Sequence, residues 1–191
     1  WFQGSGASAP VKVALEGDAT PVGGTFGIAG ELFAAAGQFT NTGRLAFFAD
    51  VLGPNAIGTF LWTPGSGIAS VVNTDDTLPP GANPVIRTFM PGASDDALAF
   101  FAFKTGGRAA WFTKPLGGAG GITRIFGEGD AAPGIGGVLW GVSPNFGLIN
   151  DNEEVAFGAF VVGGATYPAD GIFTHRPGFG LRKVVAAGDP A

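Results

Sequence analysis

Short apolar strands, separated by turns rich in glycine, proline and aspartate, make up the hydrophobic pattern of this chain. The segment Leu45-Ala46-Phe47-Phe48 recurs as Leu98-Ala99-Phe100-Phe101 and in part as Val155-Ala156-Phe157. The aligned phenylalanines are roughly 55 residues apart, a period typical of repeat architectures. Alternate residues of a strand point to opposite faces, and here both faces are mostly apolar. The pattern therefore predicts strands that are buried on both sides.

A strand that is apolar on both faces belongs in a sheet that lies between two other sheets, as in the blades of a propeller. Between successive acidic turns the pattern offers about four short strands. We therefore predict an all-β fold of propeller-like, four-stranded blades in tandem, with about three units and one extra strand. A β-trefoil is the alternative, because it also contains three four-stranded units. A sandwich or a β-solenoid is less suitable, since sandwich strands usually carry one polar face.

Glycine-rich turns divide the repeated segments from one another. We assign residues 11–67, 68–121 and 122–180 to three repeats, residues 181–191 to the start of a fourth, and residues 1–10 to a linker or the remnant of a cleaved tag. A last strand with no unit to complete would leave unpaired backbone groups at an edge. We therefore expect self-association, or binding of a partner protein, through edge strands.

An acidic turn follows a β-branched run once in each predicted unit. Glycine supplies the positive φ of such a turn, and an aspartate side chain accepts hydrogen bonds from nearby backbone. A residue that recurs once per unit fits a turn better than a single catalytic centre. We therefore predict a turn-forming role for Asp18, Asp76, Asp130 and Asp189.

Residues 150–157 read Asn-Asp-Asn-Glu-Glu-Val-Ala-Phe and resemble the N-x-x-G-x-V-A-F motif of the bacterial choice-of-anchor tandem-repeat proteins. Asn150 matches the motif asparagine, which we predict to be a structural turn residue, while Glu153 replaces the motif glycine. The earlier copies place Thr40 and Ala93 at the asparagine, and Gly43 and Asp96 at the glycine. The resemblance implies an exported, secreted or cell-surface protein with propeller-like repeats and no established catalytic site.

Composition narrows the possible partners. The net charge is −5 and no cluster of lysine and arginine is present, which argues against a nucleic-acid interface. No apolar run approaches the length of a membrane span. The chain has no cysteine, so disulfides and thiolate metal sites are excluded.

Few side chains in this sequence point to catalysis. His175 is the single histidine, which excludes a two-histidine metal site within one chain. No G-x-S-x-G motif accompanies it, so we expect a surface or structural role. Acidic pairs such as Asp75-Asp76, Asp95-Asp96 and Glu153-Glu154 with Asp151 are able to bind calcium or hydrolyse a glycoside, but turn formation is the favoured interpretation.

These observations favour a non-enzymatic, extracellular β-repeat protein that acts as a structural or interaction module, with no metal or cofactor. The alternative is a carbohydrate-binding or glycoside-hydrolysing propeller, in which exposed aromatic rings stack on a glycan. Its binding residues would be Trp62, Trp140, Asp95 and Asp96. Calcium in the acidic turns is the one cofactor that this alternative adds.

Overall fold

The fold is built from antiparallel β-strands. The computed structural model describes residues 2–3, 10–27, 37–53, 57–74, 76–79, 83–104, 109–117, 120–140, 147–164 and 169–190. All regular elements in these ranges are strands, and every pairing is antiparallel. None of the described segments forms a helix long and apolar enough to cross a bilayer. The all-β prediction is confirmed.

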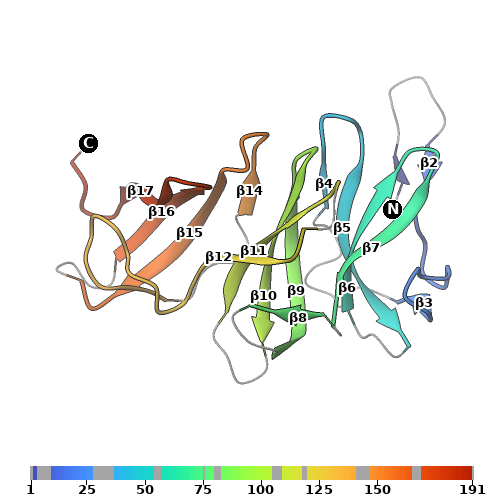
Figure 1. Ribbon diagram of the computed structural model, residues 1–191, viewed down its shortest axis with the longest axis horizontal. Helices are drawn as coiled ribbons and strands as arrows, with labels where there is room; N and C mark the ends of the chain where they lie inside the picture. Colours follow the sequence, from blue (N-terminus) through green and yellow to red (C-terminus); the bar gives the residue numbers. More distant parts are fainter. Residues whose placement is uncertain are drawn as a thin grey trace.

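Three sheets follow one another along the long axis of the molecule, in the order of the sequence (Figure 1). Sheet 1 contains β3 (Thr25–Phe26), β4 (Gly37–Phe39), β5 (Leu45–Leu52), β6 (Ile57–Thr63) and β7 (Gly67–Asn73). Sheet 2 contains β8 (Thr77–Leu78), β9 (Asn83–Ala93), β10 (Ala97–Lys104), β11 (Ala110–Pro115) and β12 (Thr123–Gly127). Sheet 3 contains β13 (Val138–Trp140), β14 (Gly147–Ile149), β15 (Val155–Val162), β16 (Ala169–Arg176) and β17 (Gly180–Ala186). Outside them, β1 (Phe2–Gln3) pairs with β2 (Val11–Lys12).

Hydrogen bonding groups the strands differently from the predicted repeat boundaries. Residues 181–191 were expected to begin a fourth repeat, yet β17 pairs with β16 as the last strand of sheet 3. In the same way β7 closes sheet 1 and β12 closes sheet 2. Residues 1–10, expected to be linker, contribute β1. The reason is the short hairpin before each of these strands, which returns the chain to the strand it has just left.

The core lies between the sheets, because both faces of the central strands are apolar. One face of β5, with Leu45 and Phe47, packs against the N-terminal residues Val13 and Ala14. The opposite face of sheet 1 packs against the face of sheet 2 that carries Phe100. A third cluster fills the space between sheets 2 and 3. We call the contact between sheets 1 and 2 the first junction and the contact between sheets 2 and 3 the second junction.

The three aligned phenylalanines have closely similar surroundings. Phe47, Phe100 and Phe157 are at most 1% exposed. Each pairs across the strand with another phenylalanine, and the ring centroids are 5.7, 5.6 and 5.7 Å apart. The partners are Phe60, Phe112 and Phe173. Offset aromatic pairs at this separation stabilise a core beyond their buried area.

A β-bulge occurs at the corresponding place in each sheet, between the last two strands. The register shifts at Thr59/Phe60, Trp111/Phe112 and Ile172/Phe173. The residues left without a Cα partner are therefore Val71, Ile125 and Val184. A bulge bends its strand and increases the local twist, so the last strand of each sheet turns toward the acidic turn that follows.

Candidate functional site

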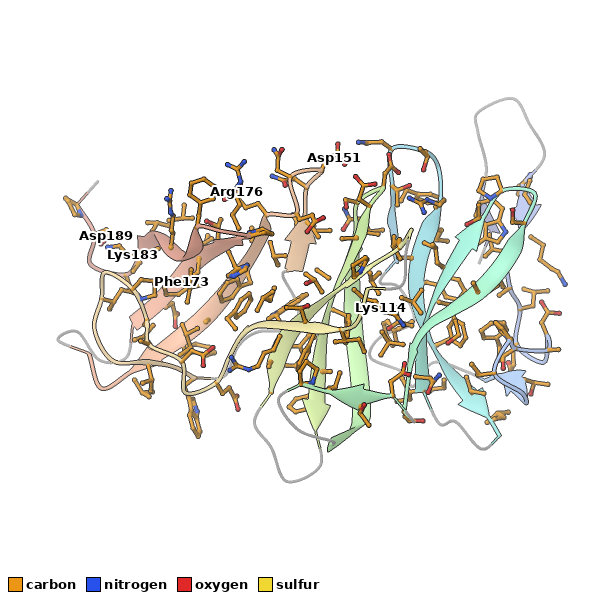
Figure 2. All side chains as sticks on the ribbon, in the orientation of Figure 1. Lys114, Asp151, Phe173, Arg176, Lys183 and Asp189 are labelled. Carbon is orange, nitrogen blue, oxygen red and sulfur yellow. The ribbon has the colours of Figure 1, made fainter. Side chains whose placement is uncertain are left out.

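Three hairpin turns lie together at one edge of the molecule, where polar side chains from all three sheets come into contact. Asn41, in the β4–β5 turn, donates a 2.7 Å hydrogen bond from Nδ2 to Oδ2 of Asp151 in the β14–β15 turn. Thr42 Oγ1 donates to Oδ1 of Asp95, in the β9–β10 turn, over 2.6 Å. The guanidinium of Arg44 donates to the backbone oxygen of Asp95. Figure 2 shows Asp151 at this edge. We call it the turn edge.

The carboxylate of Asp95 is held in its charged form. It accepts hydrogen bonds from the side chain and the backbone of Thr42, and Arg44 lies 3.6 Å away. Several interactions lower the pKa of Asp95 below its usual value, and the hydrogen bond from the Thr42 side chain is the largest of them. Asp95 therefore connects two turns. Asp96, which was predicted together with Asp95, is exposed. Its backbone N–H donates to Ser94 Oγ in the same turn, and its backbone oxygen accepts from the N–H of Leu116.

Each hairpin at the turn edge is closed by one short polar side chain. Asn150 Oδ1 accepts from the backbone nitrogens of Asn152 and Glu154, and Thr40 Oγ1 accepts from that of Arg44. In the middle turn Ser94, not Ala93, has this role, because its Oγ accepts from the backbone of Asp96 and Ala97. The motif alignment at Ala93 was wrong by one residue, since the middle turn is one residue shorter than the others.

Glu153 has a backbone conformation that glycine usually adopts. Its φ is 57°, close to the 79° of Gly43 at the same place in the first turn. A side chain in the left-handed region costs about 1–2 kcal/mol. The motif glycine is therefore the residue that this backbone favours, and this chain carries a carboxylate there.

The four predicted turn aspartates share one geometry. Each donates its backbone N–H to the carbonyl three residues earlier, and its Oδ2 accepts from the backbone nitrogen of that same residue. The side-chain bonds are Leu15 N to Asp18 (2.8 Å), Asn73 N to Asp76 (3.0 Å), Gly127 N to Asp130 (2.8 Å) and Ala186 N to Asp189 (2.8 Å). These contacts fix the exit from the last strand of each sheet. Asp75, also named as an acidic residue, lies outside the described residues.

A basic residue six positions earlier pairs with three of these aspartates, and sequence analysis missed it. The pairs are Lys12–Asp18 (3.1 Å), Arg124–Asp130 (2.8 Å) and Lys183–Asp189 (2.6 Å). The hydrogen bond from Lys183 lowers the pKa of Asp189, and the backbone N–H of Leu15 lowers that of Asp18. Asp76 has Ser70 at the corresponding position. The recurring Lys/Arg-x5-Asp spacing is the signal that would have found these pairs.

The two tryptophans proposed for glycan stacking lie in different environments. Trp62 is 7% exposed and belongs to the core between sheet 1 and the N-terminal residues. Little of its ring is therefore accessible to a ligand. Trp140, on β13, is 51% exposed and pairs with Phe160 on the face of sheet 3 that points away from sheet 2.

A cleft of about 320 Å³ opens in the second junction, beside the turn edge. From sheet 2 it is lined by Ala97, Thr113, Pro115, Thr123, Arg124 and Ile125, and from sheet 3 by Glu153, His175 and Pro177. Nδ1 of His175 is buried and has no hydrogen-bond partner. Burial lowers the pKa of His175 below 6.5, so the imidazole is neutral at pH 7. The predicted surface or structural role did not anticipate this position.

The first junction is closed at the corresponding place. Lys114 pairs with Leu98 as His175 pairs with Val155, so the two side chains occupy equivalent positions. The ammonium group of Lys114 donates a hydrogen bond to the backbone oxygen of Val71, the bulge residue of sheet 1. Figure 2 shows Lys114 between the two sheets. The equivalent bulge residue of sheet 2, Ile125, lines the open cleft.

A family model described as "Family of unknown function (DUF7453)" matches residues 1–191. The chain belongs to this family. The match spans all three sheets, so the unit that DUF7453 describes includes both junctions and the turn edge. A search of curated proteins found no match.

In the part of this DUF7453 chain that the structure describes, the predicted turn aspartates and Asp95 and Asp151 are engaged in turns. Within the described ranges, no three histidine, aspartate or glutamate side chains are grouped so that they could hold a metal ion. Asp95 and Asp151 accept hydrogen bonds from sheet 1, and the four turn aspartates accept from their own backbone. What the arrangement offers chemically is hydrogen bonding in the cleft and apolar surface on sheet 3.

Proposed function

We propose that this chain is an extracellular, non-enzymatic interaction module built from propeller-type blades, and that two copies pair through sheet 3. The observation that carries the proposal is the uncovered apolar face of that sheet. We call it the outer face, and it consists of Trp140, Leu148, Phe160, Ile172 and Val185, which are 45–66% exposed. Contiguous apolar surface of this kind marks an interaction site.

The path of the chain supports the propeller-type interpretation. Each sheet runs from an inner strand through two central strands to an outer strand, and the chain then crosses to the inner strand of the next sheet. The crossing begins at the acidic turn, and the residue after Asp18, Asp76 and Asp130 pairs with the next inner strand. The inner strand β9 lies next to both β4 and β14. Blades around an axis have this order of strands.

Equivalent positions in the other sheets support the choice of the outer face. Ile172 is 50% exposed, whereas Thr59 and Trp111 at the same place are 0% exposed. Val185 is 45% exposed, whereas Val72 and Phe126 are at most 1% exposed. These positions are buried in sheets 1 and 2 because the following sheet covers them. The outer face of sheet 3 therefore carries apolar side chains like those of a junction, and none of the described sheets covers it.

A second copy in a face-to-face arrangement is the partner that fits. The opposite end of the row is already covered, since Val13 and Ala14 pack on sheet 1. Head-to-tail association would have to displace them. The edge strand β17 carries Arg182 and Lys183, and charges on an edge disfavour strand pairing. A twofold contact between two outer faces is self-complementary and closes on itself.

The extracellular and non-enzymatic parts of the proposal have separate support. The resemblance of residues 150–157 to the choice-of-anchor motif favours an exported, cell-surface protein. Three of the carboxylates that were candidates for catalysis, those of Asp76, Asp95 and Asp151, accept structural hydrogen bonds. Groups held in this way are suited to maintaining turns.

Light scattering across a concentration series tests the pairing. We expect a mass near twice that of the chain at high concentration, and a return to the monomer mass in Phe160→Lys. Phe39→Lys is the matched control, because Phe39 is 48% exposed and Phe160 is 51% exposed. Phe39 lies on β4 of sheet 1 and is not part of the outer face. A monomer at every concentration, or equal effects of both substitutions, would contradict the proposal.

A further inference from the structure

At the place in the first junction that corresponds to the cleft, the described residues show Lys114 bound to the preceding sheet. This difference suggests that the cleft has a function of its own. Both junctions pack a phenylalanine pair against the preceding sheet and place a bulge residue opposite the third strand. Lys114 closes the first by bonding to the Val71 carbonyl. His175 is too short to do the same and leaves a space of about 320 Å³. Such a volume lies at the lower end of ligand sites, roughly 300–1,000 Å³.

The polar groups around this space are those that recognise hydroxyl groups. Thr113 and Thr123 face each other across β11 and β12, and each hydroxyl can donate and accept. Nδ1 of His175 is buried without a partner, and a buried polar atom of this kind usually has one in a complete site. Glu153 adds an acceptor. A ligand with several hydroxyl groups is the chemical class that suits the two threonine hydroxyls, the carboxylate and the imidazole ring.

The charge balance argues against a small anion. Arg124 is paired with Asp130 at 2.8 Å, so its charge is largely compensated. Glu153 contributes a negative charge on the other side. The remaining wall is apolar and consists of Ile125, Pro115 and Pro177. This combination suits a neutral ring with hydroxyl groups on its rim and C–H groups on its face.

We propose that the cleft between sheets 2 and 3 binds one sugar unit of a glycan, with His175, Thr113, Thr123 and Glu153 hydrogen-bonding its hydroxyl groups. This site differs from Trp62, Trp140, Asp95 and Asp96, the residues named from the sequence. It lies on the face of sheet 3 that packs on sheet 2, whereas the pairing proposed above uses the outer face. Either proposal can therefore fail without the other.

The single histidine makes a direct test possible, because the imidazole signals in a proton NMR spectrum belong to His175 alone. The probes are the methyl glycosides of glucose, galactose, mannose and N-acetylglucosamine, with sodium phosphate as the anionic comparison. We expect saturable movement of the imidazole signals with at least one glycoside and none with phosphate. Movement with phosphate alone, or with no probe at all, would overturn the proposal.

Variants locate the binding by calorimetry with the glycoside that gave the response. His175→Lys places in the cleft the residue found at the closed junction, and Glu153→Gln keeps the size of the side chain while removing its charge. We expect at least tenfold weaker binding in both. Lys114→Met, in the first junction, is the control and should bind as wild type does.

Thermal melts establish that each variant is folded. If His175→Lys is unfolded, Thr123→Val decides the question, because Thr123 is exposed at the rim of the cleft. Unchanged binding in Glu153→Gln and in a folded His175→Lys or Thr123→Val would contradict the assignment.

Discussion

The first and second junctions are built on the same plan, and they differ in the side chain that faces the bulge residue. In each, the central strand of one sheet places a buried phenylalanine against the sheet before it, and a bulge residue lies opposite the third strand. The side chain that faces this bulge is Lys114 in the first junction and His175 in the second. The lysine reaches the backbone of the preceding sheet, and the histidine does not.

The aromatic side chains that pack the core are separate from the side chain, Lys114 or His175, that distinguishes the two junctions. The aromatic pairs are nearly identical in separation, so each pair should stabilise its own sheet to a similar extent. The position of Lys114 and His175 lies at the end of the third strand, where a substitution changes access without changing the core. A sheet-on-sheet fold can therefore gain a cleft at one junction and keep its architecture.

The largest effects are expected from the three aligned phenylalanines, of which Phe100 and Phe157 lie in the junctions. Phe47→Ala, Phe100→Ala and Phe157→Ala should each lower the free energy of unfolding by about 3–5 kcal/mol, because each removes a fully buried ring and leaves a cavity. Thermal and urea unfolding measure this. If one variant unfolds like wild type, the equivalence of the junctions fails at that sheet.

A smaller effect is expected at the lysine that closes the first junction. Lys114→Met keeps the apolar stem and removes the donor to the Val71 carbonyl, which should cost about 1–2 kcal/mol. Lys12→Met is the comparison, because Lys12 forms an exposed ion pair worth less than about 1 kcal/mol. Urea unfolding of both variants measures the difference. Equal effects would mean that Lys114 acts only through surface charge.

The acidic turns should behave alike at both junctions. Alanine at Asp76 or Asp130 should cost about 1 kcal/mol, by analogy with the loss of a helix cap, since the backbone donor three residues earlier loses its acceptor. Asparagine should be milder, because its side chain retains an acceptor. Melting midpoints provide the measurement. A marked rise in the wild-type midpoint on adding calcium would favour metal binding in these turns instead.

The smallest effect is a pH dependence that only the second junction should have. Because burial lowers the pKa of His175, the unfolded chain binds more protons than the folded chain between the folded and unfolded pKa values. Stability contributed by the neutral histidine is therefore present above about pH 6.5 and is lost as the pH falls below it. An NMR titration of the imidazole should give a midpoint below 6.5. A midpoint above that value would contradict the burial of His175.

The strands and the acidic turns could be predicted because their signals are local. The apolar run of residues 45–52 and the Gly-Asp turns depend on neighbours in the sequence. The sequence alignment placed Ala93, and not Ser94, at the position of the motif asparagine. A turn that is shorter by one residue moves the capping residue by one position, and the sequence alone does not reveal this. The grouping of β7, β12 and β17 with the preceding sheet depends on hairpin pairing, which the repeat period does not reveal.

The candidate site depended on contacts that no local pattern contains. Lys114 and Val71 are 43 residues apart, and Asn41 and Asp151 are 110 residues apart. His175 is the single histidine of the sequence, yet its place in a cleft follows only from the packing of sheet 3 on sheet 2. The exposure of Trp140 and the burial of Trp62 likewise follow from which face of each sheet is covered.

One measurement tests the equivalence of the two junctions most directly: the free energy of unfolding after the reciprocal exchange of Lys114 and His175. We expect His175→Lys to stabilise the chain by about 1 kcal/mol, because the lysine fills the cleft and donates to the carbonyl of Ile125 as Lys114 donates to that of Val71. Lys114→His should lower the stability by a similar amount. A folded His175→Lys that is less stable than wild type by 1 kcal/mol or more would contradict this account.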